Sequence, residues 1–149
     1  MSIISPQTIK LKATASSKEE AIRIAGNLLV EAGHVTADYV EGMLAREQTM
    51  STYIGNGVAI PHGQFENKAA IKSTGISVVQ FLDGIEWEED ETAYMVIGIA
   101  ATANEHVGVL TNLAEVIEEP EDADKLIHAT DPMEIVERLS RPQEESELA

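Results

Sequence analysis

The feature that most restricts the fold is an almost continuous apolar run at residues 94–100, YMVIGIA. A strand with one face in water alternates apolar and polar residues, whereas this run is apolar on both faces. It therefore belongs in the middle of a sheet that helices cover on both sides. Residues 74–82 form a second strand-like run, and between the two lies the acidic segment 86–91, EWEEDE, which predicts a solvated loop.

A third apolar run, Val58-Ala59-Ile60, is short and is surrounded by Gly55, Gly57, Pro61 and Gly63. Glycine and proline at this density prevent a helix from continuing for two turns. The segment therefore predicts a short strand that ends in a tight loop.

Two helices are expected before this strand. Ser16 and Ser17 can cap the first, whose apolar residues recur at helical spacing up to Gly33. Thr36 can cap the second, which is expected to run to about Arg46. The two helices are expected to pack face to face across the turn at Gly33.

Three more helices are expected after the strands. Asn104 can cap the first of them, which Pro120 interrupts, and a shorter helix follows at about residues 121–128. Asp131 as cap and Pro132 at the first helical position then open the last helix. Helices before, between and after strands predict an α/β fold: one domain, residues 1–141, with a sheet flanked by helices on both sides, and an acidic tail at residues 142–149.

The charge balance excludes several classes of partner. The 149 residues include 26 Asp and Glu but only 10 Lys and Arg, which gives a formal net charge of −16. So few positive charges cannot neutralise a row of phosphates, so we expect neither nucleic-acid binding nor attraction to anionic membranes. The charge can attract a basic protein partner or can simply keep the protein soluble, and composition leaves both open.

Targeting and redox signals are also missing. No run approaches the roughly 20 apolar residues that cross a bilayer, so no membrane insertion is expected. There is no cysteine, which excludes disulfides and thiolate catalysis. With no signal-peptide pattern, a cytoplasmic location is expected.

His62 is the sharpest candidate for chemistry. It follows the short strand, and Pro61 and Gly63 stand on either side of it. Proline restricts the backbone next to the imidazole, and glycine lets the chain turn away without covering it. The alternative is a loop histidine without a task.

Two further residues can complete a phosphate site. His106 is expected in the first turn of the helix that follows the central strand, where unpaired amides favour an anion. If the strands of His62 and His106 are neighbours, both imidazoles can face one pocket. Arg46 can hold phosphate oxygens through two parallel hydrogen bonds. The alternatives are a helix-start histidine for His106, and for Arg46 a favourable charge at a helix end or a salt bridge to Glu47.

Metal and nucleotide sites find little support in the sequence. Two histidines with Glu105 can ligate zinc, but the spacing HExxH does not occur. Walker-type loops, GxGxxG and GxSxG are absent as well. We therefore expect neither a resident metal nor a cofactor.

The segment GVAIPHG at residues 57–63 resembles the active-site segment of the enzyme IIA proteins of the mannitol/fructose class, part of the bacterial phosphoenolpyruvate-dependent sugar phosphotransferase system. The resemblance covers roughly residues 15–140 and is closest to the mannitol branch. The other matching segments are KEEAIR at 18–23, Tyr39-Val40, Met43-Leu44, Arg46-Glu47, Thr52-Tyr53 with Gly55, VIGIAA at 96–101, NEH at 104–106 and VLTNL at 109–113.

The resemblance implies a mixed sheet flanked by helices and a phosphoryl carrier. His62 would carry the phosphoryl group as a phosphoramidate, His106 would hydrogen-bond to that group, and Arg46 would balance its charge. The donor would be the histidine-containing phosphocarrier protein, and the acceptor a cysteine of the mannitol enzyme IIB domain of a sugar permease. The alternatives are a fructose-type or nitrogen-regulatory enzyme IIA and, from another class, a non-catalytic binding domain.

Overall fold

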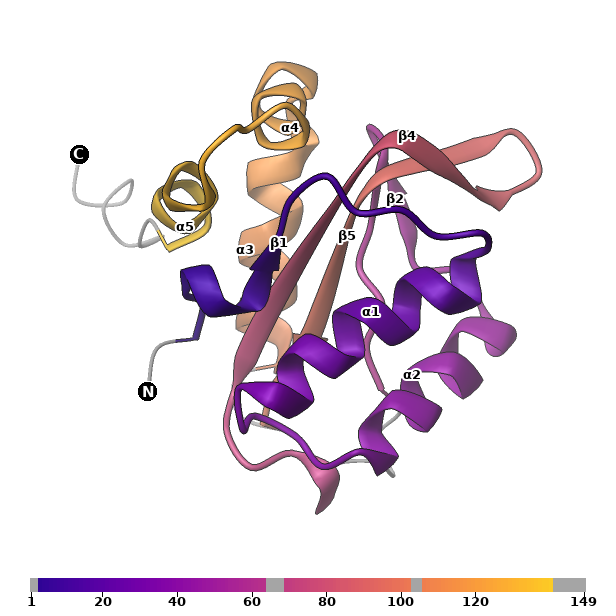
Figure 1. The fold of residues 1–149 in the computed structure, drawn as a ribbon, viewed down its shortest axis with the longest axis vertical. Coiled ribbons are helices and arrows are strands. Elements are labelled where there is room, and N and C mark those ends of the chain that lie inside the picture. The colour runs from indigo at the N-terminus through magenta and orange to yellow at the C-terminus, as the bar shows by residue number, and fades with distance from the viewer. Residues whose placement is uncertain (1–2, 64–68, 103–105, 141–149) are drawn as a thin grey trace.

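The computed structural model describes residues 3–63, 69–102 and 106–140 and forms a single α/β domain (Figure 1). The five strands are β1 (Ile9–Lys10), β2 (Tyr53–Gly55), β3 (Val58–Ala59), β4 (Gly75–Glu88) and β5 (Glu91–Ala100). The helices are a short 3₁₀ helix (Pro6–Thr8), α1 (Lys18–Glu31), α2 (Asp38–Thr49), α3 (His106–Glu118), α4 (Pro120–Ile127) and α5 (Pro132–Ser140).

The strands form one mixed sheet in the order β1-β4-β5-β3-β2. β1 runs parallel to β4 and β3 parallel to β5, whereas β4–β5 and β2–β3 are antiparallel pairs. The expected mixed sheet is confirmed. The apolar run 94–100 lies within β5, the third of the five strands in spatial order, as its composition predicts.

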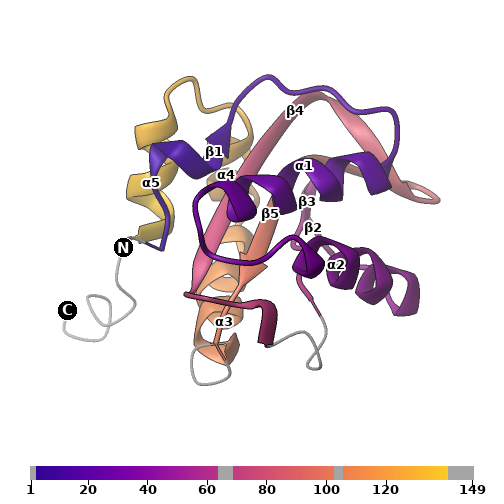
Figure 2. The ribbon, with the colours of Figure 1, turned by 60° about the horizontal axis from the view of Figure 1, so that its bottom comes forward.

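Helices cover both faces of the sheet (Figures 1 and 2). Successive strand residues point to opposite faces, so neighbours belong to different clusters. Val79 and Val96 pack in the cluster that contains the buried residues of α1 and α2. Val78 and Ile97 pack in the cluster that contains those of α3, α4 and α5. The predicted arrangement of helices on both sides is therefore confirmed.

The first two helices pack as expected. Ser17 caps α1 by accepting a hydrogen bond from the Glu20 amide at 3.2 Å, and the Glu20 carboxylate accepts one from the Ser16 amide. The helices approach so closely that a Cβ on Gly26 would lie 2.9 Å from Cγ2 of Val40. Gly33 ends the segment with a φ of 85°, a conformation that glycine adopts without strain.

The predicted cap of the second helix is wrong. α2 begins at Asp38 after Ala37, and no side chain caps it. Thr36 lies before the helix, and its amide donates to the Ala70 carbonyl at 2.8 Å, next to the bridge between Val35 and Ile71. Pairing with this distant segment determines its backbone.

The predicted solvated loop at residues 86–91 is also wrong. These residues end β4 and begin β5 in a hairpin, with the turn at Glu89 and Asp90. Trp87 is only 2% exposed, whereas Glu88 lies in solvent. At the end of β4 the acidic residues alternate with residues that face inward, which is the pattern of a strand with one exposed face. The number of carboxylates alone therefore does not distinguish such a strand from a loop.

The last helices follow their predicted signals. The carboxylate of Asp131 accepts from the Met133 amide at 2.9 Å at the start of α5. Pro120 occupies the first turn of α4, where a missing N–H costs nothing. The Asn104 cap and the tail at residues 142–149 lie outside the described residues. No helix within the described ranges is long and apolar enough to cross a membrane.

Candidate functional site

The strand register brings the end of β3 to the end of β5. Because the two strands are parallel, their carboxyl ends meet at one edge of the sheet. Val58 pairs with Met95, and beyond the proline the same register continues as a bridge between His62 and Ile99. α3 begins shortly after β5 ends at Ala100, so the backbone of His106 starts a helix at the edge that holds His62.

The imidazole of His62 is held in one orientation. The residue is 8% exposed, and its Nδ1 lies 2.8 Å from the carbonyl oxygen of Ile60. A carbonyl oxygen only accepts hydrogen bonds, so Nδ1 of the neutral ring carries the proton. The in-plane lone pair then belongs to Nε2, which is the nucleophilic nitrogen in this tautomer.

Tyr39 of α2 holds the backbone around this histidine. Its hydroxyl donates to the Ile99 carbonyl at 2.7 Å and accepts from the Gly63 amide at 2.9 Å. Gly63 must lack a side chain, because a Cβ there would lie 2.6 Å from Cε1 of Tyr39. Burial raises the pKa of the Tyr39 phenol, although the bond from Gly63 acts in the opposite direction.

Arg46 lies in the last turn of α2, and its guanidinium donates to the Met50 carbonyl at 2.8 Å. This contact is the favourable helix-end interaction that the sequence left open. The alternative salt bridge to Glu47 is wrong, since no ion pair within the described ranges joins these two residues. Glu47 instead points into the protein.

The buried Glu47 is a polar centre that the sequence did not reveal. One carboxylate oxygen accepts from the Thr52 hydroxyl at 2.6 Å, and the other accepts from Trp87 Nε1 at 2.9 Å and lies 3.5 Å from the Lys18 ammonium. The Thr52 carbonyl in turn accepts from the amide of Ile60 at 3.0 Å. The hairpin and both N-terminal helices are thereby connected to the strand that precedes His62.

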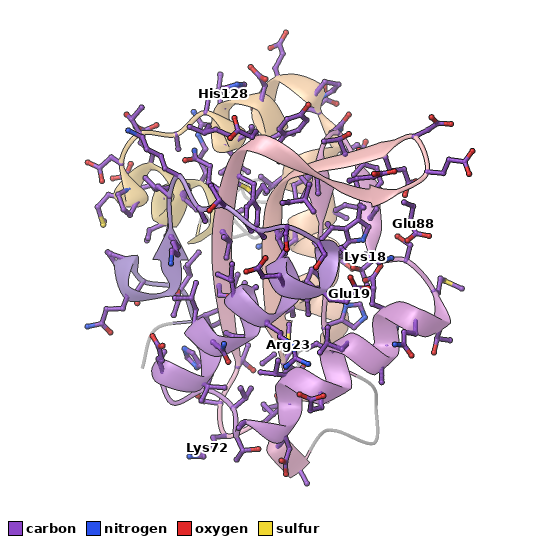
Figure 3. All side chains as sticks on the ribbon, turned by 45° about the vertical axis from the view of Figure 1, so that its right-hand side comes forward. Lys18, Glu19, Arg23, Lys72, Glu88 and His128 are labelled. Atoms are coloured by element: carbon purple, nitrogen blue, oxygen red, sulfur yellow. The ribbon has the colours of Figure 1, made fainter. Side chains whose placement is uncertain are left out.

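Lys18 completes this group at the start of α1. Figure 3 shows its side chain directed towards Glu88 of the hairpin, with which it forms an ion pair. Its ammonium also lies 5.9 Å from the centre of the Trp87 ring, within cation–π range. Burial alone would lower the pKa of Lys18, but Glu88 and Glu47 raise it.

The site residues predicted from the sequence are thus described to different extents. The structure places His62 and the backbone of His106 at one sheet edge, and it gives Arg46 a contact with Met50 at the end of its own helix. The side chain of His106 lies outside the described residues, so the pairing of the two imidazoles stays a prediction. No group of three His, Cys, Asp or Glu in the described part of the chain is placed to hold a metal ion.

Comparison with known proteins identifies the class. Residues 2–141 match the family described as "Phosphoenolpyruvate-dependent sugar phosphotransferase system, EIIA 2". The chain therefore belongs to the EIIA 2 family and is a phosphotransferase component.

Individual relatives agree with this placement. The mannitol-specific phosphotransferase enzyme IIA component of Bacillus subtilis is 43% identical over 136 residues, which cover 91% of this chain and 95% of the relative. The multiphosphoryl transfer protein of Haemophilus influenzae is 47% identical over 131 residues, 88% of this chain but only 26% of that protein. A solved complex of enzyme IIAMtl and phosphorylated enzyme IIBMtl from Escherichia coli contains a chain with a TM-score of 0.85 and 40% identity, covering 91% of this chain and 96% of that one.

Proposed function

We propose that this protein is a cytoplasmic phosphoryl carrier of a mannitol-type phosphotransferase system and that Nε2 of His62 carries the phosphoryl group. The observation that supports this most directly is the bond between Nδ1 and the Ile60 carbonyl, which leaves the lone pair on Nε2. The mannitol assignment rests on the relatives: the Bacillus subtilis enzyme IIA is 43% identical over nearly the whole chain.

The chemistry requires two successive transfers. In the first, the Nε2 lone pair attacks phosphorus on the phosphohistidine of the histidine-containing phosphocarrier protein; a P–N bond to His62 forms, and the bond to the donor ring breaks with its electron pair. In the second, a cysteine thiolate of the enzyme IIB domain attacks the same phosphorus, and the Nε2–P bond breaks. Such transfers depend mainly on alignment and charge stabilisation.

Two residues are proposed to stabilise the transferred group. His106 would donate a hydrogen bond to the phosphoryl oxygens, and the first amides of α3 lie at the same sheet edge. Arg46 would balance the charge. Its guanidinium has five N–H donors, and the bond to the Met50 carbonyl uses only Nη1.

Phosphorylation with a labelled phosphoryl source tests the proposal. The protein is incubated with phosphoenolpyruvate, enzyme I and the histidine-containing phosphocarrier protein, and acid-labile, base-stable phosphate is expected. His62→Ala must abolish the label, whereas His128→Ala must keep it, because His128 is exposed and, among the described residues, its side chain bonds only to Asp124 of α4. Unchanged labelling of His62→Ala would contradict the assignment.

A second step tests the sugar system. Purified enzyme IIB of a mannitol system is added to the labelled protein, and the phosphate is expected to move onto the enzyme IIB cysteine. Intact labelling without this transfer would favour a fructose-type or nitrogen-regulatory enzyme IIA. His106→Ala is expected to accept phosphate but to transfer it slowly.

A further inference from the structure

We propose that Tyr39 is a positioning residue for phosphoryl transfer: its hydroxyl fixes the backbone that carries His62 to the end of β5. The inference rests on the proposed function of His62. The Tyr39 hydroxyl contacts the amide of Gly63, which follows the reacting ring in the chain, and the carbonyl of Ile99 in β5. It acts through this backbone, so it is distinct from the residues proposed to contact phosphate.

The geometry makes Ile99 the common anchor of the residues that flank His62. On one side, the Ile99 amide donates to the Pro61 carbonyl at 3.0 Å. On the other, the Gly63 amide donates to the Tyr39 hydroxyl, which donates to the Ile99 carbonyl. Both neighbours of His62 are thus tied to one residue of the central strand, the first directly and the second through Tyr39.

This second tie is needed because of Pro61. A proline has no N–H, so the ladder between β3 and β5 loses a donor immediately before His62. Gly63, which follows the bridge between His62 and Ile99, belongs to no strand. The Tyr39 hydroxyl supplies the next fixed point, from a residue that is only 3% exposed and therefore has little freedom to move.

Phosphoryl transfer between proteins is sensitive to such a fixed point. The attacking nitrogen must lie in line with the bond that breaks, and a displacement of about 1 Å can lower a rate about 100-fold. Without the hydroxyl, the peptide after His62 loses its anchor, and the imidazole samples orientations that are out of line. Encounter with the donor protein needs no such alignment, so binding of the donor should change little.

The test compares two tyrosines in the same fold. Tyr39→Phe removes the hydroxyl and keeps the ring. Tyr53→Phe is the matched control, because the Tyr53 hydroxyl also accepts a glycine amide, that of Gly57 at 3.1 Å, but at the opposite end of β3. Both variants lose one bond to a glycine amide, and only Tyr39→Phe loses it next to His62.

The measurement is the single-turnover rate of phosphoryl transfer from the phosphorylated phosphocarrier protein, recorded over a range of donor concentrations. We expect Tyr39→Phe to lower the rate at saturating donor by about 10-fold or more, while half-saturation stays within about 3-fold. Tyr53→Phe should stay within about 3-fold in both quantities. The ring resonances of His62, followed by NMR, should shift in Tyr39→Phe and not in the control.

Each outcome has a distinct meaning. Equal rates for the two folded variants would overturn the inference while leaving His62 as the acceptor. An absence of label in the wild-type protein would instead contradict the proposed function. If circular dichroism shows Tyr39→Phe unfolded, Gly63→Ala replaces it, since its Cβ would lie 2.6 Å from the Tyr39 ring and displace the peptide. A folded Gly63→Ala with the wild-type rate would then overturn the inference.

Discussion

The buried carboxylate of Glu47 gives the sharpest prediction about stability. All its partners are donors: the Thr52 hydroxyl and amide, the Trp87 indole and the Lys18 ammonium. Glu47→Ala removes the shared acceptor and leaves the buried donors of Thr52 and Trp87 without it, whereas Lys18 keeps its ion pair with Glu88. Glu47→Gln keeps nearly the same volume and one acceptor oxygen, and removes the charge.

The bonds set the expected magnitudes. A buried donor without a partner costs about 1–3 kcal/mol, and Glu47→Ala leaves the Thr52 amide and hydroxyl and the Trp87 indole in that state. We therefore expect Glu47→Ala to lower the free energy of unfolding by about 3–5 kcal/mol. In Glu47→Gln the amide oxygen can accept from Trp87 while the Thr52 hydroxyl reverses its role and accepts from the amide group. Its cost is expected to be about 1–2 kcal/mol, from the lost charge.

Equilibrium urea unfolding measures both variants. Far-UV circular dichroism is the appropriate probe, because Trp87 is the only tryptophan and its fluorescence reports directly on the contact that is changed. Glu41→Gln is the control on the same helix: Glu41 pairs with Arg23 in solvent and should change stability by less than about 1 kcal/mol. Equal losses for Glu47→Ala and Glu47→Gln would show that charge, not hydrogen bonding, is decisive and would refute this reasoning.

Three further measurements test other parts of the structure. Burial lowers the pKa of His34, although its bond to Ser73 raises it, so the unfolded chain binds more protons than the folded one below about pH 6.5. The free energy of unfolding should therefore fall from about pH 7 to pH 5, and it should fall less steeply in His34→Gln. Equal slopes for the two proteins would contradict this. Gly98→Ala would place a Cβ 2.6 Å from Oγ of Ser77 and should lower the free energy of unfolding by about 1–3 kcal/mol. Gly108→Ala in α3 meets nothing within 4 Å and should raise it by about 0.5–1 kcal/mol. Urea unfolding measures both, and changes of the same sign would refute the packing argument. If the net charge of −16 attracts the donor protein, the association rate constant measured by stopped flow should decrease as the ionic strength is raised about tenfold. An association rate constant that does not change with ionic strength would assign the charge to solubility.

Local signals in the sequence predicted the elements that depend on local chemistry. Ser17 and Asp131 cap the helices they were expected to cap, because a cap acts on amides two or three residues away. The apolar run at 94–100 identified the central strand, because residues 95–100 are buried on both faces and are therefore apolar. The prediction that Thr36 caps the second helix was wrong. The backbone at Thr36 pairs with a segment distant in the sequence, through the bond from its amide to the Ala70 carbonyl.

The candidate site divides in the same way. A strand followed by Pro61, His62 and Gly63 predicts a histidine with a restricted backbone. Nothing in the spacing of the residues indicates that Tyr39 of α2 contacts the backbone next to it. That contact depends on how α2 packs over the end of β5, which is a property of the whole domain. The burial of Glu47 could not be predicted for a similar reason. Its partner Trp87 lies in a segment whose many carboxylates predicted a solvent-exposed loop.

Taken together, the contacts explain why so irregular a segment can be rigid. The amide of Ile60 is held by Thr52, which Glu47 fixes, and the carbonyl of Ile60 orients the His62 ring. The carbonyl of Pro61 accepts a hydrogen bond from Ile99 of β5, and the amide of Gly63 is connected to the same strand through the Tyr39 hydroxyl. The segment is thus fixed by partners on separate elements in place of a regular ladder. This arrangement suits the role proposed for His62, because a histidine held in one orientation at the end of a strand could meet two successive partner proteins with the same geometry.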